Sequence, residues 1–96
     1  MTLLTPLSTI AHRLPRRKSL PSQRVQSELL VQDPVCGRVH FLNPTAAIIW
    51  DACDGQVTTG ECDARLREAF EIPPTADLAA DILETVGDFR RRGMLE

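Results

Sequence analysis

The pair Asn43-Pro44 divides this chain into a strand-like part and a helix-like part. Asn is a preferred N-cap residue and Pro is preorganised for the first helical position, so a helix is expected to begin here. The run just before it, Arg38–Leu42, has the composition of an extended strand. Because the whole chain has only 96 residues, we expect one small domain in which a sheet is followed by helices.

The part before the pair predicts a β-hairpin. Residues 25–32 form one extended run with an apolar centre, and Arg38–Leu42 form a second. The loop between them contains Pro34, which fixes φ, and Gly37, which tolerates a positive φ. Two such runs around a loop of this kind are typical of a hairpin. A further short strand is expected near Ser22–Gln26.

Three helices are predicted after the hairpin. The first carries an apolar stripe at helical spacing, on which we expect Trp50 to be buried, and it ends near Gly55. Thr58 and Glu61 form a capping box that starts the second. Thr75 is expected to cap the third, which ends near Gly93. The third helix has the strongest apolar pattern in the chain: Leu78, Ala79, Ile82, Leu83, Val86 and Phe89.

The first 22 residues predict a different kind of segment. They contain Pro6, Pro15 and Pro21, a basic cluster and no sustained periodicity. We therefore expect residues 1–22 to form a flexible basic tail and residues 23–96 to form the folded domain, and we expect deletion of residues 1–20 to leave the fold intact.

Few residues could support catalysis. The cysteines Cys36, Cys53 and Cys62 match no zinc spacing, and the histidines are His12 and His40. Cys36 and His40 are close in sequence, but nothing further supports a thiol–imidazole pair. We therefore expect no enzymatic activity, no metal and no cofactor.

Charge and hydropathy bear on the other partner classes. Three consecutive arginines, Arg90, Arg91 and Arg92, could contact nucleic acid, but residues 25–96 carry thirteen acidic and only six basic side chains. A DNA reader is expected to have a basic body, so we expect no nucleic-acid partner. No stretch approaches a membrane span, and the start of the chain does not suit a secretory signal. We therefore expect no membrane partner and a cytoplasmic location.

A longer motif resembles a known family. The segment from His40 to Trp50 reads His-Phe-Leu-Asn-Pro-Thr-Ala-Ala-Ile-Ile-Trp, and Cys53-Asp54-Gly55 follows it. The chain then closes on Arg-Gly-Met-Leu-Glu. These features resemble the PqqD family of peptide chaperones, the peptide-recognition element of ribosomally made and modified peptides, over about residues 25–96.

The resemblance implies a fold and a site. The fold would be α+β and winged-helix-like, with a small three-stranded antiparallel sheet followed by three helices. The leader of a precursor peptide would add as a strand beside the last sheet strand, and its side chains would enter a cleft beside the third helix. The resemblance does not determine whether Val39 and Phe41 or the alternate residues of that strand face the helices. The implied peptide-binding residues are Arg38, Val39, His40, Phe41, Leu42, Ile82, Val86, Phe89 and Arg90, of which Arg90 could pair with an acidic leader residue.

The implied partners are the precursor leader peptide and a peptide-modifying enzyme. That enzyme would be a radical or ATP-dependent tailoring enzyme, or a kinase-like partner. Two alternatives remain, namely a winged-helix DNA-binding regulator and a regulatory subunit that binds an enzyme directly without peptide cargo. An exposed strand edge also invites pairing, so the protein is expected to be a monomer or a strand-edge dimer.

Overall fold

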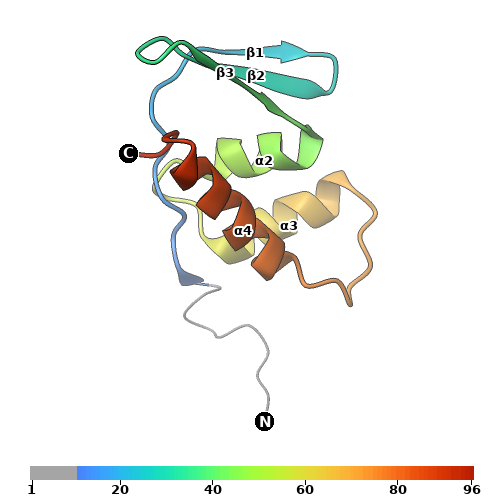
Figure 1. The fold of residues 1–96 in the computed structure, drawn as a ribbon. Coiled ribbons are helices and arrows are strands. Elements are labelled where there is room, and N and C mark those ends of the chain that lie inside the picture. The colour runs from blue at the N-terminus through green and yellow to red at the C-terminus, as the bar shows by residue number, and fades with distance from the viewer. Residues whose placement is uncertain (1–10) are drawn as a thin grey trace.

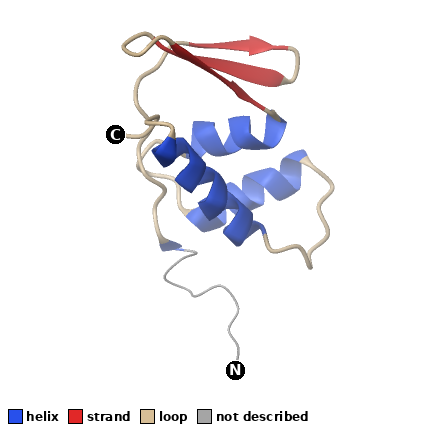
Figure 2. Cartoon of the chain, in the orientation of Figure 1, coloured by secondary structure: helices blue, strands red, loops and turns tan. Residues whose placement is uncertain are grey.

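The computed structural model describes residues 11–96 and shows an antiparallel sheet that lies over three helices (Figures 1 and 2). The strands have the spatial order β1-β2-β3, and the helices follow them in the chain. The predicted α+β arrangement is therefore confirmed. The elements are β1 (Ser22–Val25), β2 (Glu28–Asp33), β3 (Arg38–Leu42), α2 (Pro44–Ala52), α3 (Thr59–Ala69) and α4 (Leu78–Arg91).

The extended run predicted over residues 25–32 is interrupted by a turn between β1 and β2. Gln26 has a φ of 60°, a left-handed conformation that reverses the chain between β1 and β2. The antiparallel register then pairs Arg24 with Leu29 and Val25 with Glu28. The short strand that the sequence indicated near Ser22–Gln26 is therefore β1, and β2 begins later than expected.

Alternation along the strands gives the sheet one buried and one exposed face. On β2, Leu29 and Val31 are buried against the helices. Their cross-strand partners on β3 are Leu42 and His40, which are buried as well. Phe41 lies between these two on β3 and is exposed. The two-residue period of a strand therefore directs His40 and Leu42 inward and the residues between them outward.

The caps of α2 and α3 follow the sequence prediction. The side chain of Asn43 accepts a hydrogen bond of 2.8 Å from the N–H of Ala46 at the start of α2. At the start of α3, the N–H of Glu61 donates to the Thr58 hydroxyl over 3.1 Å. The N–H of Thr58 donates in return to the Glu61 carboxylate over 2.9 Å, which holds the pKa of that carboxyl below its usual value. Both helices therefore begin where their sequence signals lie.

The start of α4 differs from the prediction. Asp77 is the N-cap, and its carboxylate accepts a hydrogen bond from the N–H of Ala80 over 3.4 Å. Thr75 belongs to the preceding turn, in which the N–H of Ala76 donates to a carbonyl three residues earlier. The guanidinium of Arg67 also donates to the carbonyl of Ala76 over 2.7 Å. These contacts hold the turn in a non-helical conformation, so the prediction that Thr75 caps the helix was wrong.

The core lies between the sheet and the helices. Trp50 of α2 is 3% exposed and meets the ring of Phe89 from α4 edge to face, with ring centroids 5.3 Å apart. Ile49, Leu66 and Ile82 are also almost fully buried. The predicted burial of Trp50 is therefore confirmed. No helix within residues 11–96 has both the length and the apolar composition needed to cross a membrane.

An extended segment before β1 is part of the folded domain (Figure 1). Leu14 is 2% exposed and belongs to the core. The N–H of Leu14 donates to the carbonyl of Val57, and that of Arg17 to the carbonyl of Cys53, both over 2.8 Å. The prediction of a flexible tail over residues 1–22 therefore does not hold for its second half. Residues 1–10 lie outside the described part of the chain.

Candidate functional site

Among the residues that the structure describes, β3 is the last strand of the sheet, so one of its edges is free. The N–H of Gln32 on β2 donates to the carbonyl of Pro21 over 2.9 Å and so points away from β3. Gln32 lies opposite Val39 in the ladder. Along two antiparallel strands, hydrogen-bonded pairs of opposite residues alternate with non-hydrogen-bonded pairs, whose N–H and C=O groups point away from the neighbouring strand. The N–H and C=O of Val39, and those of Phe41 two residues on, therefore point to the free edge.

A groove with a volume of about 570 Å³ lies between the end of β3 and α4. The start of α2 closes it at one end. Its residues from β3 and α2 are Phe41, Leu42, Asn43, Thr45 and Ala46, and those from α4 are Asp81, Glu84, Thr85, Asp88, Phe89, Arg91 and Arg92. This groove lies beside the last strand and the third helix, where the family resemblance implied a cleft.

The strand residues of the implied site divide into two groups. Val39 and Phe41 are 46% and 64% exposed, and their side chains lie on the outer face of the sheet. Arg38 is exposed at the start of the strand. His40 and Leu42 are 7% and 2% exposed and face the helices. Only the main chain and the outward side chains of β3 are therefore accessible to a partner.

The helix residues of the implied site are placed differently from expectation. Ile82 and Val86 are buried in the core. Phe89 is also buried, although it borders the groove, because its ring packs against Trp50. Arg90 is exposed but does not line the groove. The apolar stripe of α4 is thus used for folding, and a neighbouring row of its residues faces the groove.

That neighbouring row consists of Asp81, Glu84, Thr85 and Asp88, which were not among the predicted site residues. These residues recur at the same helical spacing as the apolar stripe, displaced by about one position along the chain. This offset of one position could have identified them. When one stripe of a helix is buried in the core, the adjacent row of residues lies at the edge of the core.

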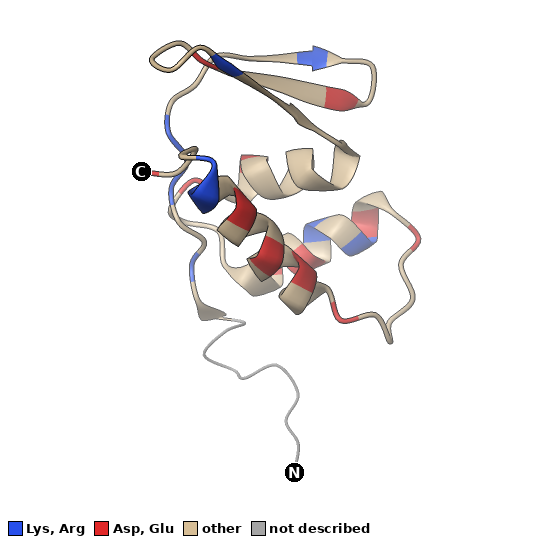
Figure 3. Ribbon diagram, viewed as in Figure 1, with Lys and Arg blue, Asp and Glu red and all other residues tan. Residues whose placement is uncertain are grey.

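Acidic residues lie along α4, and basic residues lie at its C-terminal end (Figure 3). Asp88 forms ion pairs with Arg92, at 3.1 Å, and with Arg91, at 3.7 Å. Asp81 and Glu84 form no ion pair with any residue in the described range 11–96. The end of the groove near the start of α4 is therefore acidic, and the other end carries paired charges.

His40 is a buried base without a hydrogen bond at one ring nitrogen. Its Nε2 atom has no solvent exposure and no partner among the described residues. Burial lowers the pKa of His40 below its ordinary value of 6.5, and the positive charges of Arg92 and Arg38 lower it further. Asp33 and Asp88 act in the opposite direction but are weaker. His40 is therefore neutral at neutral pH.

This environment of His40 predicts a pH dependence of stability. In the unfolded chain the residue takes up a proton near pH 6.5, whereas in the folded chain it stays neutral to lower pH. The unfolded state then binds more protons, so we expect stability to fall from about pH 8 to about pH 5.5. Urea midpoints at both pH values measure this fall, and His40→Leu should reduce it. Equal falls in the wild type and the variant would contradict the assignment.

The thiols offer no nucleophile in the core. Burial raises the pKa of Cys53 to about 12 and that of Cys62 to about 11, so both stay protonated. Cys36 lies in the exposed turn before β3, whereas His40 faces the helices. Within residues 11–96, no group of three or more metal-ligating side chains comes together.

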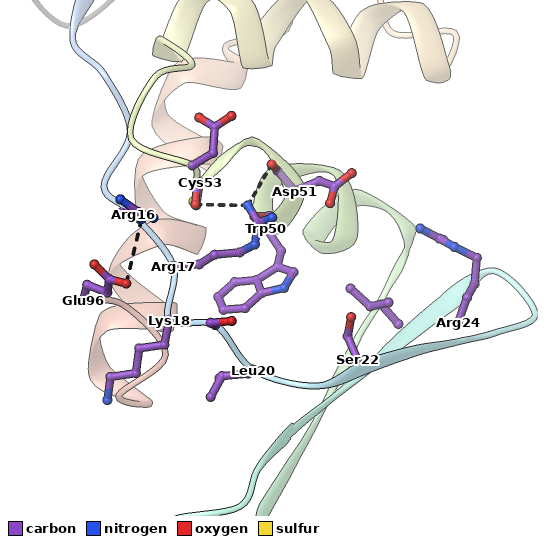
Figure 4. A pocket seen from close by; sticks show the side chains of 13 residues that line it. Arg16, Arg17, Lys18, Leu20, Ser22, Arg24, Trp50, Asp51, Cys53 and Glu96 are labelled. Carbon is purple, nitrogen blue, oxygen red and sulfur yellow. Dashed lines mark hydrogen bonds and ion pairs between the residues drawn. The ribbon is translucent and has the colours of Figure 1, made fainter.

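A second hollow, of about 460 Å³, lies where the N-terminal segment crosses the end of α2 (Figure 4). Arg17 enters it and donates hydrogen bonds to the carbonyls of Asp51, at 3.1 Å, and Cys53, at 3.2 Å. Its guanidinium also lies 5.9 Å from the centre of the Trp50 ring. A cation at a helix C-terminus and over an aromatic face is favourable. We therefore assign Arg17 a structural role as the cap of α2.

Replacing Arg17 tests that role. Arg17→Ala is expected to lower the free energy of unfolding by about 1–2 kcal/mol, the size of a favourable cation at a helix end. Arg17→Lys keeps the charge but loses the planar fork, so it should recover only part of the loss. Denaturant melts of the three proteins measure both effects. Lys18→Ala is a suitable control, because Lys18 is exposed at the neighbouring position.

Comparison with known proteins places the chain in a family. A family model described as coenzyme PQQ synthesis protein D (PqqD) matches residues 14–95. The match includes Leu14 and the N-terminal segment that packs on the core, as well as the sheet and helices. Neither the curated proteins nor the solved structures compared with the chain gave a significant match. The description of the matched family associates it with synthesis of the coenzyme PQQ. The chain therefore belongs to the PqqD family.

Proposed function

We propose that this protein is a non-catalytic peptide chaperone of the cytoplasm. It binds the leader of a ribosomally made precursor peptide as a fourth strand on β3 and presents that peptide to a modifying enzyme. The observation that supports the proposal is the edge of β3, where the main-chain groups of Val39 and Phe41 have no partner strand among residues 11–96. The groove beside α4 gives the incoming side chains a place to lie.

Strand addition suits such an edge. An extended peptide satisfies the free N–H and C=O groups, which provides affinity that depends little on sequence. Side chains that alternate along the peptide then enter the groove or lie on the outer face, which provides selectivity. A domain that uses its apolar helix stripes for its own core can bind cargo in this way without a deep pocket.

The side chains of the groove and the core also support a non-catalytic role. The buried thiols stay protonated, and among residues 11–96 the groove is lined by carboxylates and arginines but by no histidine or thiol. The modification itself would therefore be made by a separate enzyme. A DNA-binding role has less support, because the arginines at the end of α4 are partly paired with Asp88 on a helix that also exposes Asp81 and Glu84.

Proline substitutions on β3 test strand addition. Val39→Pro removes one N–H that points to the free edge, so we expect the fold to be retained, as for prolines on edge strands. Leader binding should weaken about tenfold, the effect of losing one good contact. Binding is measured by NMR titration of the labelled protein with leader segments of short precursor-like reading frames encoded near its gene. Val39→Thr is the matched control, because it keeps the N–H and the branched shape.

A second proline distinguishes the two edges of the strand. The N–H of His40 lies in a hydrogen-bonded pair with Val31 on β2, so His40→Pro should disturb the sheet itself. Circular dichroism and the denaturation midpoint measure that damage. Strand addition would be contradicted if Val39→Pro stayed folded and bound the leader as tightly as Val39→Thr. Shift changes confined to α3 and the N-terminal segment would contradict the groove.

A further inference from the structure

We infer that the cargo recognised by this groove carries a basic side chain immediately next to a large apolar one. The basic side chain enters the groove toward Asp81 and Glu84, and the apolar one lies against Phe41 on the outer face of the sheet. The inference rests on the proposed function, because it assumes an extended peptide along the edge of β3. It adds the chemical class of that peptide.

The apolar requirement comes from the outer face of the sheet. Phe41 is a large aromatic side chain that is 64% exposed, and Val39 beside it is 46% exposed. Leu30 lies opposite Phe41 on β2 and continues the same face. A strand added at the free edge places the side chain opposite Phe41 on this face as well. Because aromatic and aliphatic cross-strand pairs stabilise a sheet, an apolar residue is favoured at that peptide position.

The basic requirement comes from the inner face. The peptide residue next to the apolar one points to the opposite side of the strand, toward the groove and α4. On the Leu42 side of the groove, the wall of α4 presents the carboxylates of Asp81 and Glu84. Neither is paired with a cation of the described residues, and both are exposed. A lysine or arginine that enters here meets two negative charges one helical turn apart.

The other end of the groove does not offer an uncompensated carboxylate to a basic peptide side chain. There, Asp88 already pairs with Arg91 and Arg92, so its charge is compensated within the protein. In Figure 1, β3 runs from the side on which α4 ends toward the start of α2, so Leu42 lies toward the acidic half of the groove. The charge pattern therefore also specifies an orientation, because the basic residue lies on the Leu42 side of the residue that contacts Phe41.

A selection experiment with random peptides tests the inference and does not require the natural cargo. The probe is a display library of peptides with about 12 random residues, a length that can pair along an open strand edge. It is selected on the wild-type protein and on Asp81→Lys/Glu84→Lys. The matched control is Glu68→Lys/Glu71→Lys, which makes the same charge change on exposed residues outside the groove. Each selected peptide is retested against Val39→Pro.

The expected result is enrichment of Lys or Arg beside a large apolar residue on the wild type and on the control. The groove variant should instead enrich Asp or Glu at that position. A wild-type peptide should bind the groove variant about tenfold more weakly in about 0.1 M salt, and the difference should shrink in about 1 M salt. If peptides are enriched and depend on Val39 but show no charge preference, this inference is overturned and the proposed function stands. If no enriched peptide is sensitive to Val39→Pro, both are overturned.

Discussion

Trp50→Ala is expected to lower the free energy of unfolding by about 3–5 kcal/mol, the range for large aromatic side chains removed from a core. Trp50 is 3% exposed, and its ring meets that of Phe89 at an angle of 77°. It also lies under the guanidinium of Arg17. The substitution thus removes a contact between α2 and α4 and the support of the cation that caps α2. For a small domain, whose stability is about 5 kcal/mol or somewhat more, this loss leaves little margin.

Phe41→Ala is the matched control for this substitution. It also truncates an aromatic side chain to Ala, but Phe41 is mostly exposed on the outer face of the sheet. We expect it to change stability by about 0.5 kcal/mol or less, as surface substitutions usually do. Denaturant melts of both variants measure the difference. An unchanged midpoint for Trp50→Ala, or equal losses for both variants, would show that the core does not depend on Trp50.

The elements that the sequence predicted correctly are those with local signals. Asn43 caps α2, and Thr58 with Glu61 caps α3, because each cap is a hydrogen bond between residues three positions apart. The bounds of β3 were also predicted, because the turn at Gly37 and the cap at Asn43 enclose it. Such signals can be identified whatever the rest of the fold is.

The features that were missed depend on contacts between distant residues. Thr75 and Asp77 are both good caps, and the choice between them depends on Arg67, which holds the turn between α3 and α4. The inner face of β3 could not be chosen from the sequence, because Val39 and Phe41 are more apolar than His40, which is nevertheless buried. In each case the tertiary structure overrides a local preference.

The groove of α4 shows the same limit. The sequence identified the apolar row of Ile82 and Val86, and the family resemblance identified the helix as part of a site. Apolar residues at helical spacing are expected both in a core and in a peptide-binding groove. The sequence alone therefore did not show that all residues of this row are buried in the core. Once that row is buried, the groove is lined by Asp81, Glu84 and Asp88.

Deleting residues 1–18 is expected to destabilise the domain by more than about 4 kcal/mol and to leave it largely unfolded. The deletion removes Leu14 from the core, and losing a buried Leu alone costs about 2–5 kcal/mol. It also removes main-chain hydrogen bonds to the carbonyls of Val57, Cys53 and Met94, each contributing about 0.5–1.5 kcal/mol. Arg17 is lost in addition, and with it the cap of α2.

A shorter deletion is the control. Removing residues 1–10 keeps Leu14, Arg17 and every contact described for them, so it should lower the denaturation midpoint far less than removing residues 1–18. Circular dichroism of the two truncated proteins distinguishes them. Leu14→Ala in the full chain should reproduce part of the loss and separate the buried side chain from the main-chain pairing.

The N-terminal segment joins two elements that border the groove, α2 and α4. It pairs with the end of α2 through Cys53 and with the residues after α4 through Met94 and Leu95. Because α4 forms one wall of the groove and α2 closes one end, the segment helps to hold them in position. Leu14→Ala, if it remains folded, should therefore weaken leader binding as well as stability. Full leader binding by a folded protein that lacks residues 1–18 would contradict this account.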